Sequence, residues 1–220
     1  RVGTGNIIGV STAICLGGFG AIFWMWITAI LGGASAFIES TLAQIYKHKD
    51  SDGTYYGGPS YYMQNALKQR WLGIIFAVIL ILTYVVGYNM LASFNTQDTF
   101  KTFSFYDPSK TPIIIGAILA VLFALCVLGG GKRLTNITGI LVPVMGLIYI
   151  VVSLIVVIMN ITNLPLVLKN IFVAAFDFKA IFGGFAGSCM MWGIKRGLYS
   201  NEAGMGSAPN AAASADVSHP

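Results

Sequence analysis

The sequence predicts an all-α polytopic membrane protein, and three observations carry this prediction. Of the 220 residues, 56% are hydrophobic and only 10% are charged, whereas soluble domains carry about a quarter charged residues. Long uncharged stretches separate the charges, at residues 2–38, 71–97, 111–131 and 134–168. A helix needs about 20 apolar residues to cross a bilayer. These stretches also lack the period-two alternation of barrel strands, so each is expected to form helix.

The apolar stretches divide into segments in chain order. A short helix is expected at residues 7–16, followed by a Gly-Gly-Phe-Gly turn. Four whole spans are expected at residues 21–46, 71–96, 112–128 and 138–159. The polar loop after the first whole span has a turn signal at Asp52-Gly53, and its Tyr-Tyr-Met-Gln-Asn-Ala-Leu end favours a short interfacial helix. A turn is expected at residues 129–133, and a shorter apolar stretch covers residues 180–194.

Basic residues predict the orientation of the spans. One set of loops carries Lys47, Lys49, Lys68, Arg70, Lys132, Arg133, Lys195 and Arg196. The alternate loops carry Lys101, Lys110, Lys169 and Lys179, partly offset by Asp98, Asp107 and Asp177. Because loops rich in Lys and Arg tend to stay in the cytoplasm, the first set is predicted to be cytoplasmic. The basic residues flank spans and form no stripe, so nucleic acid is not an expected partner.

Two glycine-rich segments interrupt the helical pattern. Glycine inside a helix costs about 1 kcal/mol relative to alanine, yet the chain opens with Gly3-Thr4-Gly5-Asn6. Unwound backbone within a membrane is tolerated where it lines a cavity or is buried in protein. The second segment, residues 181–187, reads Ile-Phe-Gly-Gly-Phe-Ala-Gly in a run too short to cross the bilayer. For the first segment, the alternative is a small-residue patch for helix packing.

Two broken segments with four whole spans between them are typical of an inverted-repeat transporter. The chain is then an internal fragment, a single incomplete transporter domain over residues 1–220. Residues 1–160 would form the first five-span repeat without its N-terminal start. Residues 161–220 would form a connector and the first broken span of the second repeat.

Four motifs carry a resemblance to a known family. They are GTGNIIGV at the start, GGFGAIFWMWITAILG at residues 17–32, DGTYYGGPSYY in the polar loop, and KRGLYSNEAGMGSAPNAAA at residues 195–213. Across essentially the whole chain, the sequence resembles the alanine or glycine:cation symporters, also called sodium:alanine symporters. The resemblance implies a LeuT-type inverted-repeat fold and cotransport of a small neutral amino acid with sodium.

The resemblance also implies site residues at the two breaks. Substrate contacts are implied at Thr4 and Gly5, a sodium role at Gly3 and Asn6, and a pocket lining at Gly184, Phe185, Ala186 and Gly187. Family members commonly carry a substrate-binding Gln on the third span, where this chain has Ala92 in GYNMLASF. This departure bears on the identity of the substrate.

Other polar and aromatic residues have two interpretations each. Arg196 and Glu202 could pair to hold an inner gate closed, or they could be a topology-setting cation and a solvated turn residue. Glu39, an acid within a span, is either functional or a hydrogen-bonding group that faces the bundle. The aromatic run at residues 23–26 looks like a cofactor-binding box, but part of an interfacial belt is the favoured interpretation, because such belts are far commoner.

The expected function is sodium-coupled symport of alanine or glycine across the plasma membrane. The partners are then the amino acid, sodium and the lipid bilayer, with sodium as cotransported cation and no resident cofactor. An enzyme is not expected, because no nucleophile, base and orienting group occur together. Two alternatives stay open. One is a channel-like ion pore with the glycine breaks as its filter, and the other is the same fold with another amino acid or with proton coupling.

Overall fold

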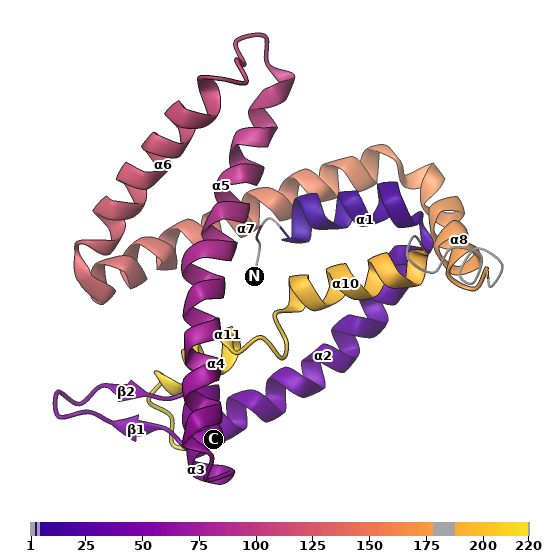
Figure 1. Cartoon of the computed structure of the whole chain (residues 1–220). Coiled ribbons are helices and arrows are strands. Elements are labelled where there is room, and N and C mark those ends of the chain that lie inside the picture. Colours follow the sequence, from indigo (N-terminus) through magenta and orange to yellow (C-terminus); the bar gives the residue numbers. More distant parts are fainter. Residues whose placement is uncertain (1–2, 4, 178–187, 220) are drawn as a thin grey trace. The chain divides into compact units, whose positions relative to one another are not determined.

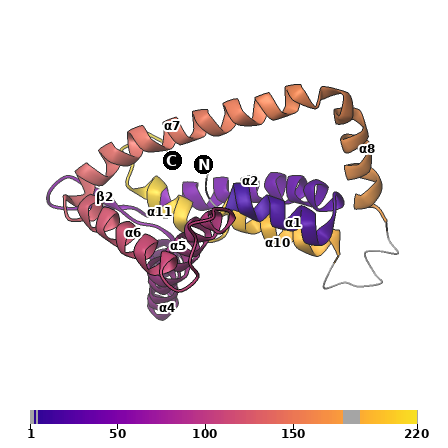
Figure 2. The same cartoon turned by 90° about the horizontal axis from the view of Figure 1, so that it is seen from above.

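The computed structural model describes residues 3, 5–177 and 188–219. The described chain is helical apart from one short β-hairpin (Figures 1 and 2). It divides into two compact units, residues 1–8 with 86–166 and residues 9–85 with 167–220. Each unit is described by itself.

In the second unit, α2 (Gly20–Ile45) is the central helix. The elements around it are α1 (Val10–Gly17), α3 (Pro59–Ala66), α10 (Cys189–Asn201) and α11 (Ser207–Ala213), all of which pack against α2 (Figure 1). The hairpin of β1 (His48–Lys49) and β2 (Tyr55–Tyr56) follows α2, and α4 (Arg70–Leu82) packs on α3. The helix α8 (Leu164–Ala175) completes the unit.

Glycines allow α10 to lie directly against α2. Gly193 and Gly197 are four residues apart and therefore share one face of α10. A Cβ built on Gly193 would lie 2.5 Å from the Ala21 carbonyl oxygen, and one on Gly197 would lie 2.7 Å from Thr28 Cβ. Since neither position has room for a side chain, the two backbones approach as in small-residue membrane packing.

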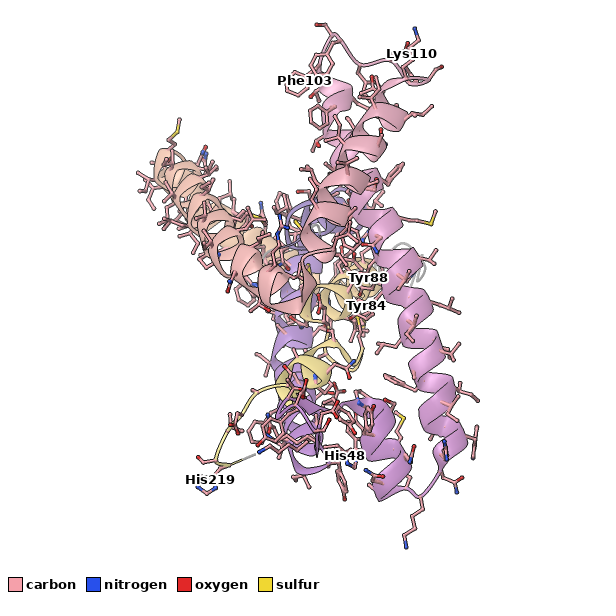
Figure 3. All side chains as sticks on the ribbon, turned by 90° about the vertical axis from the view of Figure 1, so that its left-hand side faces the viewer. His48, Tyr84, Tyr88, Phe103, Lys110 and His219 are labelled. Atoms are coloured by element: carbon pink, nitrogen blue, oxygen red, sulfur yellow. The ribbon has the colours of Figure 1, made fainter. Side chains whose placement is uncertain are left out.

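The first unit holds the π-helix η1 (Gly5–Gly9), except for its last residue Gly9, which belongs to the second unit. It also holds the helices between residues 89 and 163. These are α5 (Asn89–Asp98), the 3₁₀ turn η3 (Thr99–Thr102), α6 (Thr111–Val127), α7 (Gly130–Met159) and the 3₁₀ turn η4 (Ile161–Asn163). Within this unit α6 packs against both α5 and α7. The π-helix η2 (Thr83–Tyr88) continues α4 into α5 (Figure 3, Tyr84 and Tyr88).

Three helices are long and apolar enough to cross a membrane: Gly20–Ile45, Arg70–Thr102 and Arg133–Met159. Three of the four predicted whole spans are therefore confirmed by length and composition. The fourth corresponds to α6, whose 17 residues would span about 26 Å. The apolar side chains of α7 are exposed, Ile140 by 72% and Ile150 by 55%. The all-α membrane class is thus confirmed at this level.

The predicted turn at residues 129–133 is wrong over most of its length. The turn covers residues 128–129, and α7 begins at Gly130, whose φ of +78° suits glycine. The prediction began this span at residue 138, where the continuous apolar sequence begins. A helix satisfies its own backbone hydrogen bonds, however, so it continues past the apolar core into polar sequence. Polar side chains in this part of α7 also bond to the helix backbone: the Thr138 hydroxyl donates to the Leu134 carbonyl at 2.9 Å.

Several elements were absent from the sequence-based expectations, among them α8, η2 and the hairpin. The helix α8 occupies a stretch that was treated as connector, and η2 interrupts the α-helical geometry of the second whole span. The third is the hairpin, which forms around the predicted Asp52-Gly53 turn: Gly53 has a φ of +84°, and the Asp50 N–H donates to the Thr54 carbonyl at 2.8 Å. Of the apolar stretch at 180–194, residues 180–187 lie outside the described residues.

Candidate functional site

The first predicted break lies at the start of the first helix. Residues Gly5–Gly9 form η1, which runs directly into α1, and the Asn6 N–H donates to the Gly3 carbonyl at 3.1 Å. Thr4 lies outside the described residues. π-helical segments are rare and occur frequently at functional sites. The backbone therefore departs from α-helical geometry at Gly5 and Asn6 but remains helical, so the prediction of unwound backbone is wrong at these two residues.

The second predicted break ends where a helix begins. Its residues Gly184, Phe185, Ala186 and Gly187 lie outside the described residues. Ser188 caps the N-terminus of α10, its hydroxyl accepting the Met191 N–H at 3.2 Å. The first turn of a helix presents N–H groups and the positive end of the helix dipole. The chain thus places a helix N-terminus immediately after the predicted break.

Side chains of α2 and α10 hold the end of α8. Trp24 Nε1 donates to the Ala175 carbonyl at 3.2 Å, and Cys189 Sγ donates to the Ala174 carbonyl at 3.4 Å. Both carbonyls belong to the last turn of α8, where no intrahelical donor is available. Phe23 packs against Phe176 with ring centroids 5.0 Å apart. Phe23 and Trp24 thus contact protein, and their place in an interfacial belt stays a prediction.

Ala92 lines a pocket of about 360 Å³ between α5 and α6. The other lining residues on α5 are polar: Asn89, Ser93 and Thr96. Those on α6 are small or apolar: Gly116, Leu119, Ala120 and Phe123. The Thr96 hydroxyl donates to the Ala92 carbonyl at 2.8 Å. The lining carries no charged side chain, so the pocket suits a neutral group. Asn89, Ser93 and Thr96 were missed from the sequence, although polar residues three or four apart on a span were the available signal.

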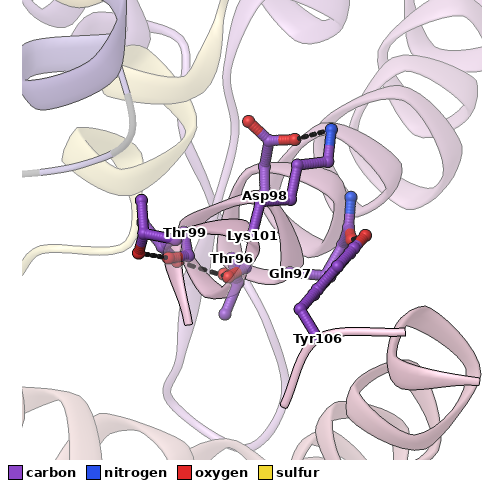
Figure 4. Close-up of polar contacts among 7 residues, drawn as sticks. Thr96, Gln97, Asp98, Thr99, Lys101 and Tyr106 are labelled. Carbon is purple, nitrogen blue, oxygen red and sulfur yellow. Dashed lines mark hydrogen bonds and ion pairs between the residues drawn. The ribbon is translucent and has the colours of Figure 1, made fainter. Parts of the chain in front are cut away.

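The end of α5 is held by polar contacts (Figure 4). The Tyr106 hydroxyl donates to Gln97 Oε1 at 2.8 Å, and Asp98 forms an ion pair with Lys101. Both side chains of that ion pair are about half exposed, where such pairs contribute little to stability. These contacts order the end of the helix and do not build a charged site.

The two predicted gate residues have contacts within their own segments. The Arg196 guanidinium lies 5.8 Å from the centroid of the Trp192 ring on the same helix. Glu202 follows α10 in the left-handed conformation, with a φ of +53°, and accepts the Ser207 hydroxyl at 2.6 Å. Glu202 therefore shapes the turn between α10 and α11, and its pairing with Arg196 stays a prediction.

Glu39 connects α2 to that turn. Its Oε1 accepts the Ser35 hydroxyl at 3.2 Å, and its Oε2 accepts the Gly204 N–H at 3.3 Å. A hydrogen bond to an ionised acceptor is stronger than one between neutral groups. Burial, assisted by the Glu39 charge, raises the pKa of the Tyr62 phenol on α3. The bundle-facing interpretation of Glu39 is the one that these contacts support.

Two further side chains of the α2 end bind the same downstream segment through its backbone. Gln44 Nε2 donates to the Ala212 carbonyl and, at 3.3 Å, to the Ala215 carbonyl. Lys47 Nζ donates to the Ala215 carbonyl at 2.8 Å. Together with Glu39, these residues bind residues 204–215 through backbone groups. Sequence reasoning missed this set, because backbone partners leave no mark in the sequence.

Within the described residues, no group of three or more His, Cys, Asp and Glu side chains could hold a metal ion. A transported sodium ion would instead use neutral oxygens, as hard cations do in broken-helix transporters. At η1 the Gly3 carbonyl, which accepts the Asn6 N–H at 3.1 Å, and the Asn6 side-chain amide both carry neutral oxygens. The sodium role of Gly3 and Asn6 stays a prediction.

The chain is similar to transporters over its whole length. The model of the "Sodium:alanine symporter family" matches residues 1–220. Relatives include the "Probable sodium/glutamine symporter GlnT" of Bacillus subtilis, 49% identical, and the "Sodium/alanine symporter AgcS" of Methanococcus maripaludis, 42% identical. The "Amino-acid carrier protein AlsT" of Bacillus subtilis is 48% identical. Each alignment covers 100% of this chain but only 45%, 48% and 46% of GlnT, AgcS and AlsT, so the chain spans about half the length of these relatives.

Proposed function

The chain belongs to the sodium:alanine symporter family, and from this premise we propose that it functions in sodium-coupled symport of a small neutral amino acid across the plasma membrane. The family is one of transporters, not enzymes. The observation that carries the proposal is the family match over every residue of the chain, together with three helices able to span a membrane.

The proposed mechanism uses a LeuT-type inverted-repeat fold. Gly3 and Asn6 at η1 contribute to a sodium site, and Thr4 and Gly5 bind the substrate backbone. Gly184, Phe185, Ala186 and Gly187 line the pocket from the second break. Two features support this scheme: η1 departs from α-helical geometry, and the N-terminus of α10 begins directly after the second break. Binding of both solutes would favour a closed state that reopens inward, since a ligand stabilises the state it binds more tightly.

The substrate is proposed to be alanine, glycine or a similar neutral amino acid. The named relatives differ, since one is named for glutamine and another for alanine. Ala92 lines an uncharged pocket with room beside its methyl group, and this supports a neutral substrate without selecting its size. Competition of labelled alanine uptake by glycine, serine and glutamine would rank these candidates.

The test is uptake of labelled alanine into proteoliposomes that contain the full-length transporter, with and without an inward sodium gradient. We expect accumulation above equilibrium that collapses when the gradient is dissipated. Asn6→Ala should raise the sodium concentration required for half-maximal uptake, because it removes an oxygen from the proposed sodium site. The matched control is Asn136→Ala, in an exposed position on α7.

Sodium currents that do not depend on any amino acid would support the channel-like alternative instead. Uptake driven by a proton gradient in the absence of sodium would retain the fold and replace the coupling ion. An equal effect of Asn6→Ala and Asn136→Ala would contradict the sodium role of Asn6.

A further inference from the structure

The segment between α2 and α4 lies at one membrane surface. The helix α2 ends at Ile45 and α4 begins at Arg70, and both belong to helices able to span a bilayer. Two successive spans joined by so short a segment must leave and re-enter the membrane on the same side. We therefore expect the hairpin and α3 at the level of the lipid headgroups or just outside them. Figure 3 labels His48 within this group.

The hairpin has two different faces, because alternate residues of a strand point to opposite sides. His48 pairs with Tyr56 across the ladder, and their rings stack with centroids 5.7 Å apart. This face turns toward α3, where Tyr61 lies 5.6 Å from His48 between ring centroids and Asn65 Nδ2 lies 3.1 Å from His48 Nε2. One face of the hairpin is thus used for packing within the protein.

The other face gathers two ammonium groups on one aromatic ring. Lys49 pairs with Tyr55 across the ladder, and Lys47 lies two residues before Lys49 on the same side. The Lys47 and Lys49 Nζ atoms lie 4.3 Å and 5.6 Å from the centroid of the Tyr55 ring. Lys47 also donates to the Ala215 carbonyl, which leaves two of its three N–H groups. Lys49 is exposed.

The acids of this loop are engaged with its own turn. Asp50 Oδ1 accepts the Ser51 N–H at 2.7 Å. Asp52 Oδ1 accepts the Thr54 hydroxyl at 2.6 Å and the Thr54 N–H at 3.0 Å, and these bonds hold the pKa of Asp52 below its usual range. Lys68 and Arg70, both exposed, add further positive charge before α4. The segment thus carries four basic residues and two acids, and the acids are hydrogen-bonded within the turn.

We propose that the Lys47–Lys49–Tyr55 face of the hairpin binds the phosphate headgroups of anionic phospholipids. Tyrosine rings favour the depth of the headgroups, where one side of the ring is apolar and the hydroxyl is hydrated. Juxtamembrane lysines are attracted to anionic lipid, and two ammonium groups held on one ring provide a compact positive site. The predicted cytoplasmic location of this loop places it at the leaflet in which anionic lipids attract basic segments.

The test measures lipid binding by the full-length transporter. Purified protein is titrated with phosphatidylglycerol and with phosphatidylcholine of the same acyl chains, and the bound lipids are counted by native mass spectrometry. Lys49→Gln removes one exposed ammonium, and Lys110→Gln is the matched control, an exposed lysine in the loop that follows the same span in the sequence. We expect roughly fivefold weaker binding of phosphatidylglycerol for each lysine removed, and no change for Lys110→Gln.

The double variant Lys47→Gln, Lys49→Gln should weaken phosphatidylglycerol binding further. The single variant Lys49→Gln decides the test, because Lys47 also donates to the Ala215 carbonyl and its loss would disturb that contact. Equal phosphatidylglycerol affinity of Lys49→Gln and the unmodified protein would overturn the proposal. An equal loss in Lys110→Gln would do the same, as it would report a diffuse charge effect. Binding of inorganic phosphate as strong as that of phosphatidylglycerol would show a free-anion site in place of a lipid site.

Discussion

At the scale of single residues, Glu39 shows how an acid is accommodated within a membrane-spanning helix. Its two carboxylate oxygens accept hydrogen bonds from the Ser35 hydroxyl and from the Gly204 N–H. A buried or partly buried charge is tolerated when such donors replace its hydration. Glu39 thus ties α2 to the turn after α10 through the backbone N–H of Gly204.

Glu39→Ala should lower the free energy of unfolding by about 1.5–3 kcal/mol, the usual contribution of a hydrogen bond to a charged group. Glu39→Gln retains an acceptor oxygen and should lower it less. Ser35→Ala, the control, removes one of the two donors to this carboxylate and leaves the Gly204 contact, so it should lower the free energy of unfolding less than Glu39→Ala. Unfolding of the full-length protein in detergent measures all three, and Glu39→Ala equal to the unmodified protein would contradict the role of the Gly204 contact.

At the scale of elements, the pairing of α2 with α10 depends on positions that carry no side chain. Gly193 and Gly197 bring the backbone of α10 against Ala21, Trp24 and Thr28. Membrane helices gain little from burying apolar surface against each other, since lipid is equally apolar, and they rely on close packing instead. The glycines therefore provide the contact on which the position of α10 depends.

Gly197→Ala should destabilise the protein by about 1–3 kcal/mol, because its Cβ has no room beside Thr28 and the helices must separate. Gly33→Ala is the matched control on α2: no atom lies within 4 Å of its added Cβ, and alanine favours helix by about 1 kcal/mol over glycine. Thermal unfolding of both variants decides the point. Equal stability of the two variants would mean that α2 and α10 are not in tight contact.

At the scale of the whole molecule, the outward apolar side chains of α7 need a surrounding that is not water. The exposed fractions of Ile140 and Ile150 would be unusual on a soluble protein. In a bilayer, lipid tails or further helices of the transporter cover such a surface. The family match and the span lengths agree with this environment.

The thiol of the variant Ile150→Cys should therefore react with a water-soluble maleimide at least an order of magnitude more slowly than the thiol of Lys110→Cys. The reason is that the reactive thiolate forms in water. The measurement uses the full-length protein in liposomes, with serine at the native Cys15, Cys126 and Cys189. Equal labelling rates at the two positions would place this part of α7 in contact with water.

Much of the architecture could be predicted because it depends on local composition. Long uncharged stretches predicted the spans at α2, α4–α5 and α7, and Asp52-Gly53 predicted the turn of the hairpin. The start of α7 was missed because the helix extends beyond its apolar residues into the polar sequence before them. The sodium and substrate residues at the breaks remain expectations from the family, and only Gly3, Gly5 and Asn6 among the residues at the breaks lie in the described part of the chain.

The sequence by itself determined that this is a helical membrane protein of the sodium:alanine symporter family, because lipid demands long apolar segments and the family motifs are local in the chain. The tertiary structure alone decided which groups meet across the chain. It joined Trp24 to Ala175, Glu39 to Gly204, and Gly197 to Thr28. In the pairs Trp24–Ala175 and Glu39–Gly204, one partner is a backbone group, which every residue possesses. In the pair Gly197–Thr28, the close contact depends on the missing side chain of the glycine. Such contacts become visible only when the helices are placed side by side.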